Sequence, residues 1–230
     1  MKEILINSAF FGVFLCLGAF QLSLIIKKRL KFAIFNPLLI SNLLVIGTLL
    51  VFDIPYESFE NSAKHISFFL TPLTVCLAVP LYEQLNLLKN NLSAILAGLI
   101  GGVIGGLLCI YLLSLIFGLN HEFFVTLLPK SVTAPIAIGV SEKLGGVVTI
   151  TVASVIITGI FGNMCGAWLL KIFRVKNSVA KGLALGAAGH AMGTARAIEM
   201  GSIEGAMASL ALAITGLLTV IGASIFAMML

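Results

Sequence analysis

Four ionisable side chains stand inside apolar stretches of this sequence: Glu83, Lys130, His190 and Arg196. An ionisable group within a lipid bilayer costs at least about 2.5 kcal/mol, so each of these needs a structural or functional reason. The sequence contains no metal-ligand cluster, no nucleotide-binding loop and no nucleophile–base arrangement. It therefore predicts no metal site, no cofactor, no catalytic residue and no enzyme.

Lys130 follows Pro129 and is accompanied by the hydroxyls of Ser131 and Thr133. Pro135 breaks the helical pattern there and leaves a backbone carbonyl without its donor. A cation beside hydroxyls and free backbone groups is suited to hold a small anion. The alternative is a lysine that extends its ammonium to the membrane surface.

His190 is flanked by Gly189 and Gly193, which predict a helix break or a close approach of another backbone. A histidine there is suited to bind substrate or relay a proton, or it simply bonds a neighbouring helix. Arg196 would face about 120° away from His190 on a continuous helix, so only a break near Gly193 brings them together. The alternative is a surface pair between Arg196 and Glu199.

Glu83 follows a predicted helix break at Pro80 near the end of an apolar segment. A buried carboxylate there would bind a coupling cation or pair with a basic side chain. Its position within two turns of the segment's end favours the simpler interpretation, a carboxylate at the membrane surface.

The composition predicts an all-α integral membrane protein, with residues 1–230 as a single membrane domain. Of the 230 residues, 60% are hydrophobic and 10% are charged, whereas soluble domains carry about 25% charged residues. The net charge of +5 comes from cations in short loops, which set membrane topology and give no reason to expect a nucleic-acid partner.

About seven apolar segments are long enough to cross a bilayer. They are Ile4–Ile26, Phe35–Phe52, Ile66–Leu88, Leu92–Leu119, Val147–Leu170, the glycine-rich Lys181–Glu199, and Ala206–Leu230. A polar linker, Asp53–His65, separates the second and third.

Residues 121–146 are expected to form a re-entrant or broken segment. The basic cluster at residues 27–31 is predicted to be cytoplasmic, which places the N-terminus outside. A full crossing by residues 121–146 would put the basic cluster at 171–181 outside, against the same rule. The conflict disappears if residues 121–146 enter and leave the membrane on the same side. Re-entrant backbone of this kind needs protein or a watery cavity around it. The alternative is a kinked crossing with an exceptional charge distribution.

This topology allows an inverted repeat. The third and seventh segments are both interrupted, at Pro80 and Gly193, and each carries an ionisable residue just beyond the break. Matching broken helices in two halves are typical of the substrate site of a transporter. Separately, Gly101/Gly105 and Gly102/Gly106 form two small-residue steps that suit either internal packing or a homodimer.

Four stretches resemble the CidB/LrgB family of bacterial membrane proteins, over nearly the whole chain and closer to the CidB side. They are Asn36-Pro37-Leu38-Leu39, Pro80-Leu81-Tyr82-Glu83, Leu127–Ala137 and Ala180–Arg196. The resemblance implies a multi-pass protein of the bacterial plasma membrane. Members are described as holin-like or antiholin-like proteins that control murein hydrolase activity and lysis with a small CidA- or LrgA-type membrane partner. Related proteins carry small carboxylates, including plastid glycolate/glycerate and bacterial pyruvate.

The residues favour the carrier over the holin-like alternative. A lytic pore needs no particular interior site, whereas this sequence concentrates prolines, glycines, hydroxyls and charges at two membrane-depth positions. We therefore expect a carrier of monocarboxylates such as pyruvate, lactate or glycolate, with His190 or Glu83 as the ion-coupling group. The predicted substrate-binding residues are Lys130, Ser131, Thr133, His190, Thr194 and Arg196.

Overall fold

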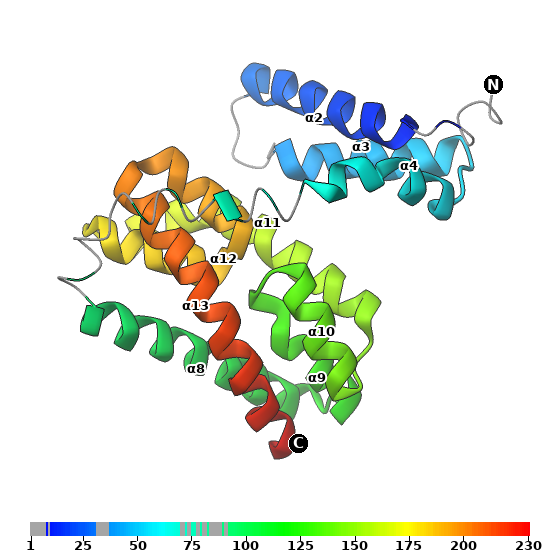
Figure 1. Cartoon of the computed structure of the whole chain (residues 1–230). Coiled ribbons are helices and arrows are strands. Elements are labelled where there is room, and N and C mark those ends of the chain that lie inside the picture. The colour runs from blue at the N-terminus through cyan, green and yellow to red at the C-terminus, as the bar shows by residue number, and fades with distance from the viewer. Residues whose placement is uncertain are drawn as a thin grey trace. The chain divides into compact units, whose positions relative to one another are not determined.

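The computed structural model describes residues 8, 10–30, 37–69, 72, 75–76, 79, 82, 89 and 92–230 (Figure 1). Their contacts divide the chain into two compact units, residues 1–76 and 77–230, which are treated separately below. The prediction of a single membrane domain stays a prediction. Pro80 and Glu83 lie outside the described residues.

The described part of unit 1 includes the helices α2 (Phe11–Leu30), α3 (Pro37–Val51) and α4 (Tyr56–Phe68). The helix α4 occupies the segment expected to be a polar linker. It packs on α2 where the amide of Gly12 donates to the Ser62 hydroxyl at 2.9 Å. This segment alternates apolar and charged residues at helical spacing, so it forms an amphipathic helix rather than an irregular loop.

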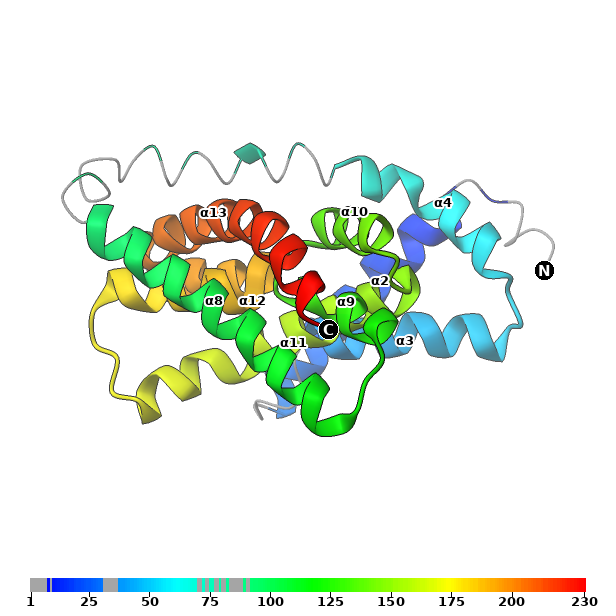
Figure 2. The same cartoon turned by 90° about the horizontal axis from the view of Figure 1, so that it is seen from below.

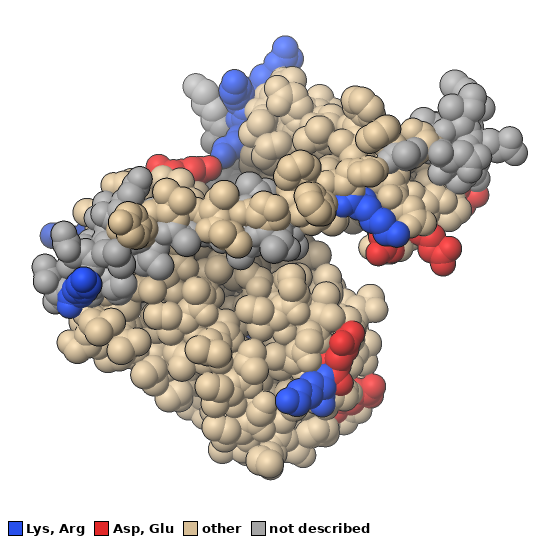
Figure 3. Space-filling view, in the orientation of Figure 1, with Lys and Arg blue, Asp and Glu red and all other residues tan. Residues whose placement is uncertain are grey.

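Four described helices are long and apolar enough to cross a membrane: α2, α8 (Leu92–Phe117), α11 (Val148–Ile172) and α13 (Ser202–Phe226). Many of their large apolar side chains are exposed, as expected for lipid-facing helices. Charged side chains occupy only small parts of the surface visible in Figure 3. The predicted all-α membrane class is confirmed.

Residues 121–144 fold into what we call the first hairpin: α9 (His121–Leu127), the 3₁₀ turn η1 (Leu128–Ser131) and α10 (Ala134–Leu144). At 1.5 Å per residue, α9 and α10 are about 10 and 16 Å long, too short to span a bilayer of about 30 Å. Thr151 of α11 joins its two arms: the Thr151 hydroxyl donates to the Thr126 carbonyl at 2.9 Å and lies 2.7 Å from Ser141 Oγ. The segment therefore turns back on itself, as expected for a re-entrant segment.

The helix α12 (Ser178–Met200) also turns back on itself, and we call it the second hairpin. Its backbone is non-helical at His190, with φ 39° and ψ −130°. On a straight helix Gly193 and Leu185 would lie about 12 Å apart. Instead, a Cβ on Gly193 would collide with the backbone of Leu185. The segment expected to be a broken seventh crossing is thus broken, but at His190, and its two halves lie side by side.

The helices α8 and α13 run side by side in the same direction (Figure 2). Ile95 near the start of α8 clusters with Met207 near the start of α13, and Ile110 clusters with Ala227 at the other end. If one hairpin crossed the membrane and the other did not, α13 would run opposite to α8. The predicted topology, with residues 121–146 re-entrant and the seventh segment crossing, is therefore corrected: both segments are hairpins.

Unit 2 consequently repeats one order of elements, a hairpin followed by a span. The first hairpin precedes α11, and the second precedes α13. The first half of α12 runs antiparallel to α11, since Gly162 meets Gly189 and Gly166 meets Leu185, and it runs parallel to α13. The two spans therefore run in opposite senses. The predicted pairing of the third and seventh segments cannot be compared, because most of the third lies outside the described residues.

The small-residue steps of α8 make no internal packing contact in the described part of the chain. A Cβ added at Gly101, Gly102, Gly105 or Gly106 would meet no atom within 4 Å. A homodimer through this face stays a prediction.

Replacing Gly193 by alanine should destabilise the second hairpin. The added Cβ would meet the backbone of Leu185, which has no flexible side-chain atom to move aside. We expect the melting temperature of the purified protein in detergent to fall by roughly 5 °C. The matched control is Gly139→Ala in α10, where an added Cβ meets nothing within 4 Å. Equal melting of both variants would contradict the folded-back arrangement.

Candidate functional site

Lys130 lies at the tip of the first hairpin. Pro129 departs from helical geometry, with φ −86° and ψ 18°, so the chain turns between α9 and α10. Leu128 and Pro129 are buried beneath the tip, while the Lys130 ammonium donates to the neighbouring Ser131 hydroxyl at 3.1 Å. The turn contacts α8, α11, α12 and α13. The half-buried lysine therefore lies among the helices of unit 2. A lysine that binds an anion and one that extends to the membrane surface both stay predictions.

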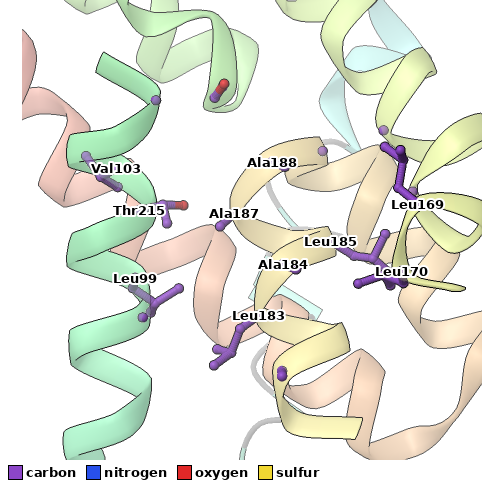
Figure 4. Close-up of a pocket in the computed structure, with 18 of the residues that line it drawn as sticks. Leu99, Val103, Leu169, Leu170, Leu183, Ala184, Leu185, Ala187, Ala188 and Thr215 are labelled. Atoms are coloured by element: carbon purple, nitrogen blue, oxygen red, sulfur yellow. The ribbon is translucent and has the colours of Figure 1, made fainter. Parts of the chain in front are cut away.

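A cavity of about 910 Å³ opens beside this tip (Figure 4). It is lined by α8, η1, α11, α12 and α13, and most of its wall is apolar. Figure 4 shows Leu99 and Val103 of α8 on one side and Leu183, Ala187 and Ala188 of α12 on the other. Lys130 is the only basic side chain that lines it within the described residues. The polar lining side chains are Lys130, Ser131, Thr158, Asn177, Thr215 and Thr219.

His190 forms the tip of the second hairpin and is buried. Its φ of 39° lies in a region that favours glycine, so the backbone there is strained at a cost of about 1–3 kcal/mol. Two contacts hold it: Nε2 lies 3.1 Å from the Val155 carbonyl oxygen, which makes Nε2–H the donor, and the ring packs on Gly159. The adjacent Gly189 lines the cavity.

The helix α11 joins the two tips at one place. The Val155 carbonyl bonds His190 of the second hairpin, and the Val155 side chain packs against Val132 and Ala137 of the first. About two turns beyond Val155, Asn163 donates to the Met192 carbonyl at 2.9 Å and fixes the start of the returning half-helix. The tips therefore converge at the middle of unit 2.

Both tips are also where a half-helix begins. The helix α10 begins at Ala134, directly after the first tip, and the second half of α12 begins after His190. A helix N-terminus carries a partial positive charge and free N–H groups. These two N-termini lie next to the tips, but no residue of α10 or of the second half of α12 is among those that line the cavity, so the positive charge in its wall beside the tips comes from Lys130.

Several predicted binding residues lie outside the cavity lining. Thr133 precedes α10, and its side chain makes no capping bond. Thr194 is buried and donates to the Ala208 carbonyl at 3.4 Å. Arg196 is 36% exposed and pairs with Glu199 at 2.5 Å, which matches the surface pair left open by the sequence. The break at His190 does not bring Arg196 to the cavity. Pro135 lies in the first turn of α10, next to the tip.

Sequence reasoning did not single out Thr215 and Thr219, which face the cavity from α13. Their spacing of one helical turn was a signal that would have placed both hydroxyls on one face of the last span. It also did not anticipate the hydroxyls of Thr126, Ser141 and Thr151 that fasten the first hairpin. The described residues contain no group of histidine, cysteine or carboxylate side chains that could hold a metal.

Long helices contact the turn of the first hairpin on several sides, and His190 at the second tip is buried, which is the condition for irregular backbone within lipid. These features define an α-helical, multi-pass membrane protein with an internal, mostly apolar cavity. The chain belongs to the LrgB-like family, whose model matches residues 16–229.

Relatives of known name support this assignment. The antiholin-like protein LrgB of Bacillus mycoides (strain KBAB4) is 39% identical over 213 residues, which cover 92% of this chain and 93% of that protein. Proteins of the same name from Bacillus cereus (strain B4264) and Bacillus anthracis (strain CDC 684 / NRRL 3495) are 38% identical over the same shares. These relatives carry the LrgB name, whereas the sequence resemblance leaned toward the CidB side. No solved structure matches this chain.

Replacing His190 by glycine should harm the fold less than replacing it by alanine. Both changes remove the bond to the Val155 carbonyl, but only glycine adopts a φ of 39° without strain. We expect His190→Gly to melt a few degrees above His190→Ala, against the usual preference for alanine in helices of about 1 kcal/mol. Thermal melts of the purified variants measure this. A lower melting temperature for the glycine variant would mean that the helix is continuous at this position.

Proposed function

We propose that this protein is an antiholin-like membrane protein that restrains murein hydrolase activity and lysis, together with a small LrgA-type membrane partner. The observation that carries this proposal is the identity of 38–39% over 92% of the chain to proteins named antiholin-like. The match extends through both hairpins, because the family model covers residues 16–229.

This role is tested in a bacterial host that lacks its own LrgB-family proteins. Expression of the protein with an LrgA-type partner should slow detergent-induced autolysis and reduce extracellular murein hydrolase activity on zymograms. The comparison variant is Gly193→Ala, whose less stable second hairpin should weaken this effect. If cells that express the wild-type protein lyse at the same rate as host cells that carry an empty vector, the antiholin-like role is refuted.

We further propose that the molecular activity beneath this role is the carriage of small monocarboxylates. The observation that favours it is the cavity lined by Lys130 and Ser131, where the first hairpin supplies an ammonium and a hydroxyl. The mostly apolar wall suits the short carbon chain of such an acid. A lysis-controlling protein with no ligand of its own would have no use for a half-buried cation among its spans, which is costly in a membrane.

The two hairpins supply a route for alternating access. They precede spans of opposite direction, so they enter from opposite sides of the membrane, and their tips converge beside Val155 in α11. Broken helices that meet near the membrane midplane are the arrangement in which carriers bind substrate. Movement of one hairpin at a time would expose the cavity to one side. In this proposal Lys130 and Ser131 hold the carboxylate, and His190 positions the second tip and is the candidate for a coupled proton.

The roles predicted for Thr133, Thr194, Arg196 and Glu83 stay predictions. Thr194 and Arg196 lie on the returning half of the second hairpin, so they are suited to act when that hairpin moves. Localisation in the bacterial plasma membrane with the N-terminus outside is part of the same proposal, since both hairpin orientations follow from the charge distribution.

Replacing Lys130 by methionine should abolish uptake while preserving the fold. Methionine keeps the length and the apolar stem of lysine but removes the charge that attracts a carboxylate. We expect uptake of labelled pyruvate, lactate or glycolate into proteoliposomes to fall at least about tenfold, because a lost charged hydrogen bond is worth about 1.5–3 kcal/mol.

The matched control is Lys143→Met, a change to an exposed lysine of the same hairpin that does not line the cavity. It should transport as the wild type does. The carrier proposal is wrong for the isolated protein if wild-type vesicles take up none of the three acids, or if they leak a large dye.

A further inference from the structure

The cavity is elongated along the spans of unit 2. Its lining residues run from Ala94 to Ile110 on α8 and from Thr158 to Phe173 on α11. At 1.5 Å per residue, these stretches are about 24 and 22 Å long. The cavity therefore extends along most of a hydrocarbon core of about 30 Å.

The two ends of the cavity lie on different elements. One end is at the first tip, where Leu128 clusters with Ile110 of α8. The other end, which we call the loop end, is at the connection from α11 to α12. There Phe173, Val175 and Asn177 line the cavity.

The size and polarity of the cavity favour a larger and more apolar occupant than a three-carbon acid. Gly98 and Gly102 of α8 and Phe161 and Leu169 of α11 line it and are exposed, so it opens on the surface of unit 2. Its volume of about 910 Å³ lies near the upper limit of pockets that enclose drug-sized molecules. Water is a poor occupant of a mostly apolar cavity. An acyl chain is the apolar occupant that a bilayer supplies.

The loop end belongs to a basic segment, residues 171–181, which contains no carboxylate. Its cations are Lys171, Arg174, Lys176 and Lys181. Arg174 and Lys176 are exposed, and each stands between two residues that line the cavity. Glu204 of α13 does not line the cavity, and its carboxylate lies against Gly201. Basic pockets between membrane helices are typical sites for anionic lipid head groups.

Arg174 occupies a backbone position that usually belongs to glycine. Its φ is 55°, and its amide donates to the Lys171 carbonyl at 3.1 Å. The next amide, of Val175, donates to the Leu170 carbonyl at 2.9 Å. These two bonds form the helix ending in which glycine is the usual residue, because glycine adopts a positive φ without strain. The chain thus carries a guanidinium beside the cavity where the backbone alone favours glycine.

The first turn of α12 faces the loop end as well. The Asn177 side-chain oxygen accepts a hydrogen bond from the Ala180 amide at 3.1 Å, and both residues line the cavity. A helix N-terminus carries a partial positive charge. The loop end therefore combines a helix N-terminus with side-chain cations, which is a setting suited to phosphate.

We propose that an anionic phospholipid occupies this cavity, with its phosphate at the basic segment and one acyl chain along the apolar wall towards the first tip. The inference goes beyond the proposed function and does not rest on it. A cation that only sets membrane topology needs no cavity beside it, so lipid selectivity and the shape of the cavity are tested separately.

The charge is tested by native mass spectrometry of the purified full-length protein in detergent, titrated with phosphatidylglycerol or phosphatidylcholine of identical oleoyl chains. The wild type should bind phosphatidylglycerol about tenfold more tightly. Arg174→Gly combined with Lys176→Gln should reduce this preference to within about threefold, and it should fold because glycine suits position 174. The matched control, Lys28→Gln with Arg29→Gln, removes the same charge at the end of α2 and should keep the preference.

The shape is tested by filling the cavity. Gly102→Leu places a side chain in the cavity, whereas Gly101→Leu, one residue earlier on α8, does not, and a Cβ at either position meets no atom within 4 Å. Gly102→Leu should weaken phosphatidylglycerol binding at least about fivefold, and Gly101→Leu should leave it unchanged.

Three results would overturn the inference: equal affinity of the wild type for both lipids, equal loss in the two double variants, or equal effects of the two leucine substitutions. Binding of neither lipid would overturn it too, and a dimer that only Gly102→Leu dissociates would then identify a second copy as the occupant. None of these results depends on uptake of an acid, so the carrier proposal and this inference fail separately.

Discussion

The hydrogen bond between His190 and the Val155 carbonyl is the interaction on which the arrangement of unit 2 depends. It fastens the tip of the second hairpin to α11 at the residue whose side chain packs on the first hairpin. Without it, a histidine with a φ of 39° would have nothing to offset its strain, and the two halves of α12 would gain by straightening. Straightening would withdraw Gly189 from the cavity and separate the tips.

The close approach of helix backbones to one another is the second constraint, and it follows from the lipid that surrounds the protein. Lipid gives no hydrophobic drive for helices to associate, so packing area must come from close contact. The second hairpin meets α11 through Gly162 and Gly189, and it meets α13 at Gly186, beside the Ala208 carbonyl. A Cβ on Gly162 or Gly186 would collide with backbone. These glycines therefore set how closely the first half of α12 can lie against the two spans, and Gly162 and Gly189 also line the cavity.

The spans could be predicted from sequence because a bilayer imposes a length and a polarity on each one. The first hairpin was also predictable, since a full crossing would place the basic cluster at 171–181 on the wrong side. The second hairpin could not be predicted in this way. It is as long as a membrane-spanning helix, and a hydropathy profile does not show that the chain turns back at a single residue. Its break was expected near Gly193, but Gly193 serves instead to let Leu185 approach.

A cavity with one cation argues for a bound ligand more strongly than for a pore. A pore must stay hydrated along its length, and polar side chains would then line it from side to side. Here most of the wall is apolar, with six polar side chains spread over η1, α11, α13 and the residue before α12, so water alone would be a poor occupant. An acid with a short carbon chain matches both parts, its carboxylate at Lys130 and its chain against the leucines and glycines. If the proposed functions hold and one hairpin position binds the acid more tightly than the other, filling the cavity would favour that position and would couple lysis to the supply of the acid.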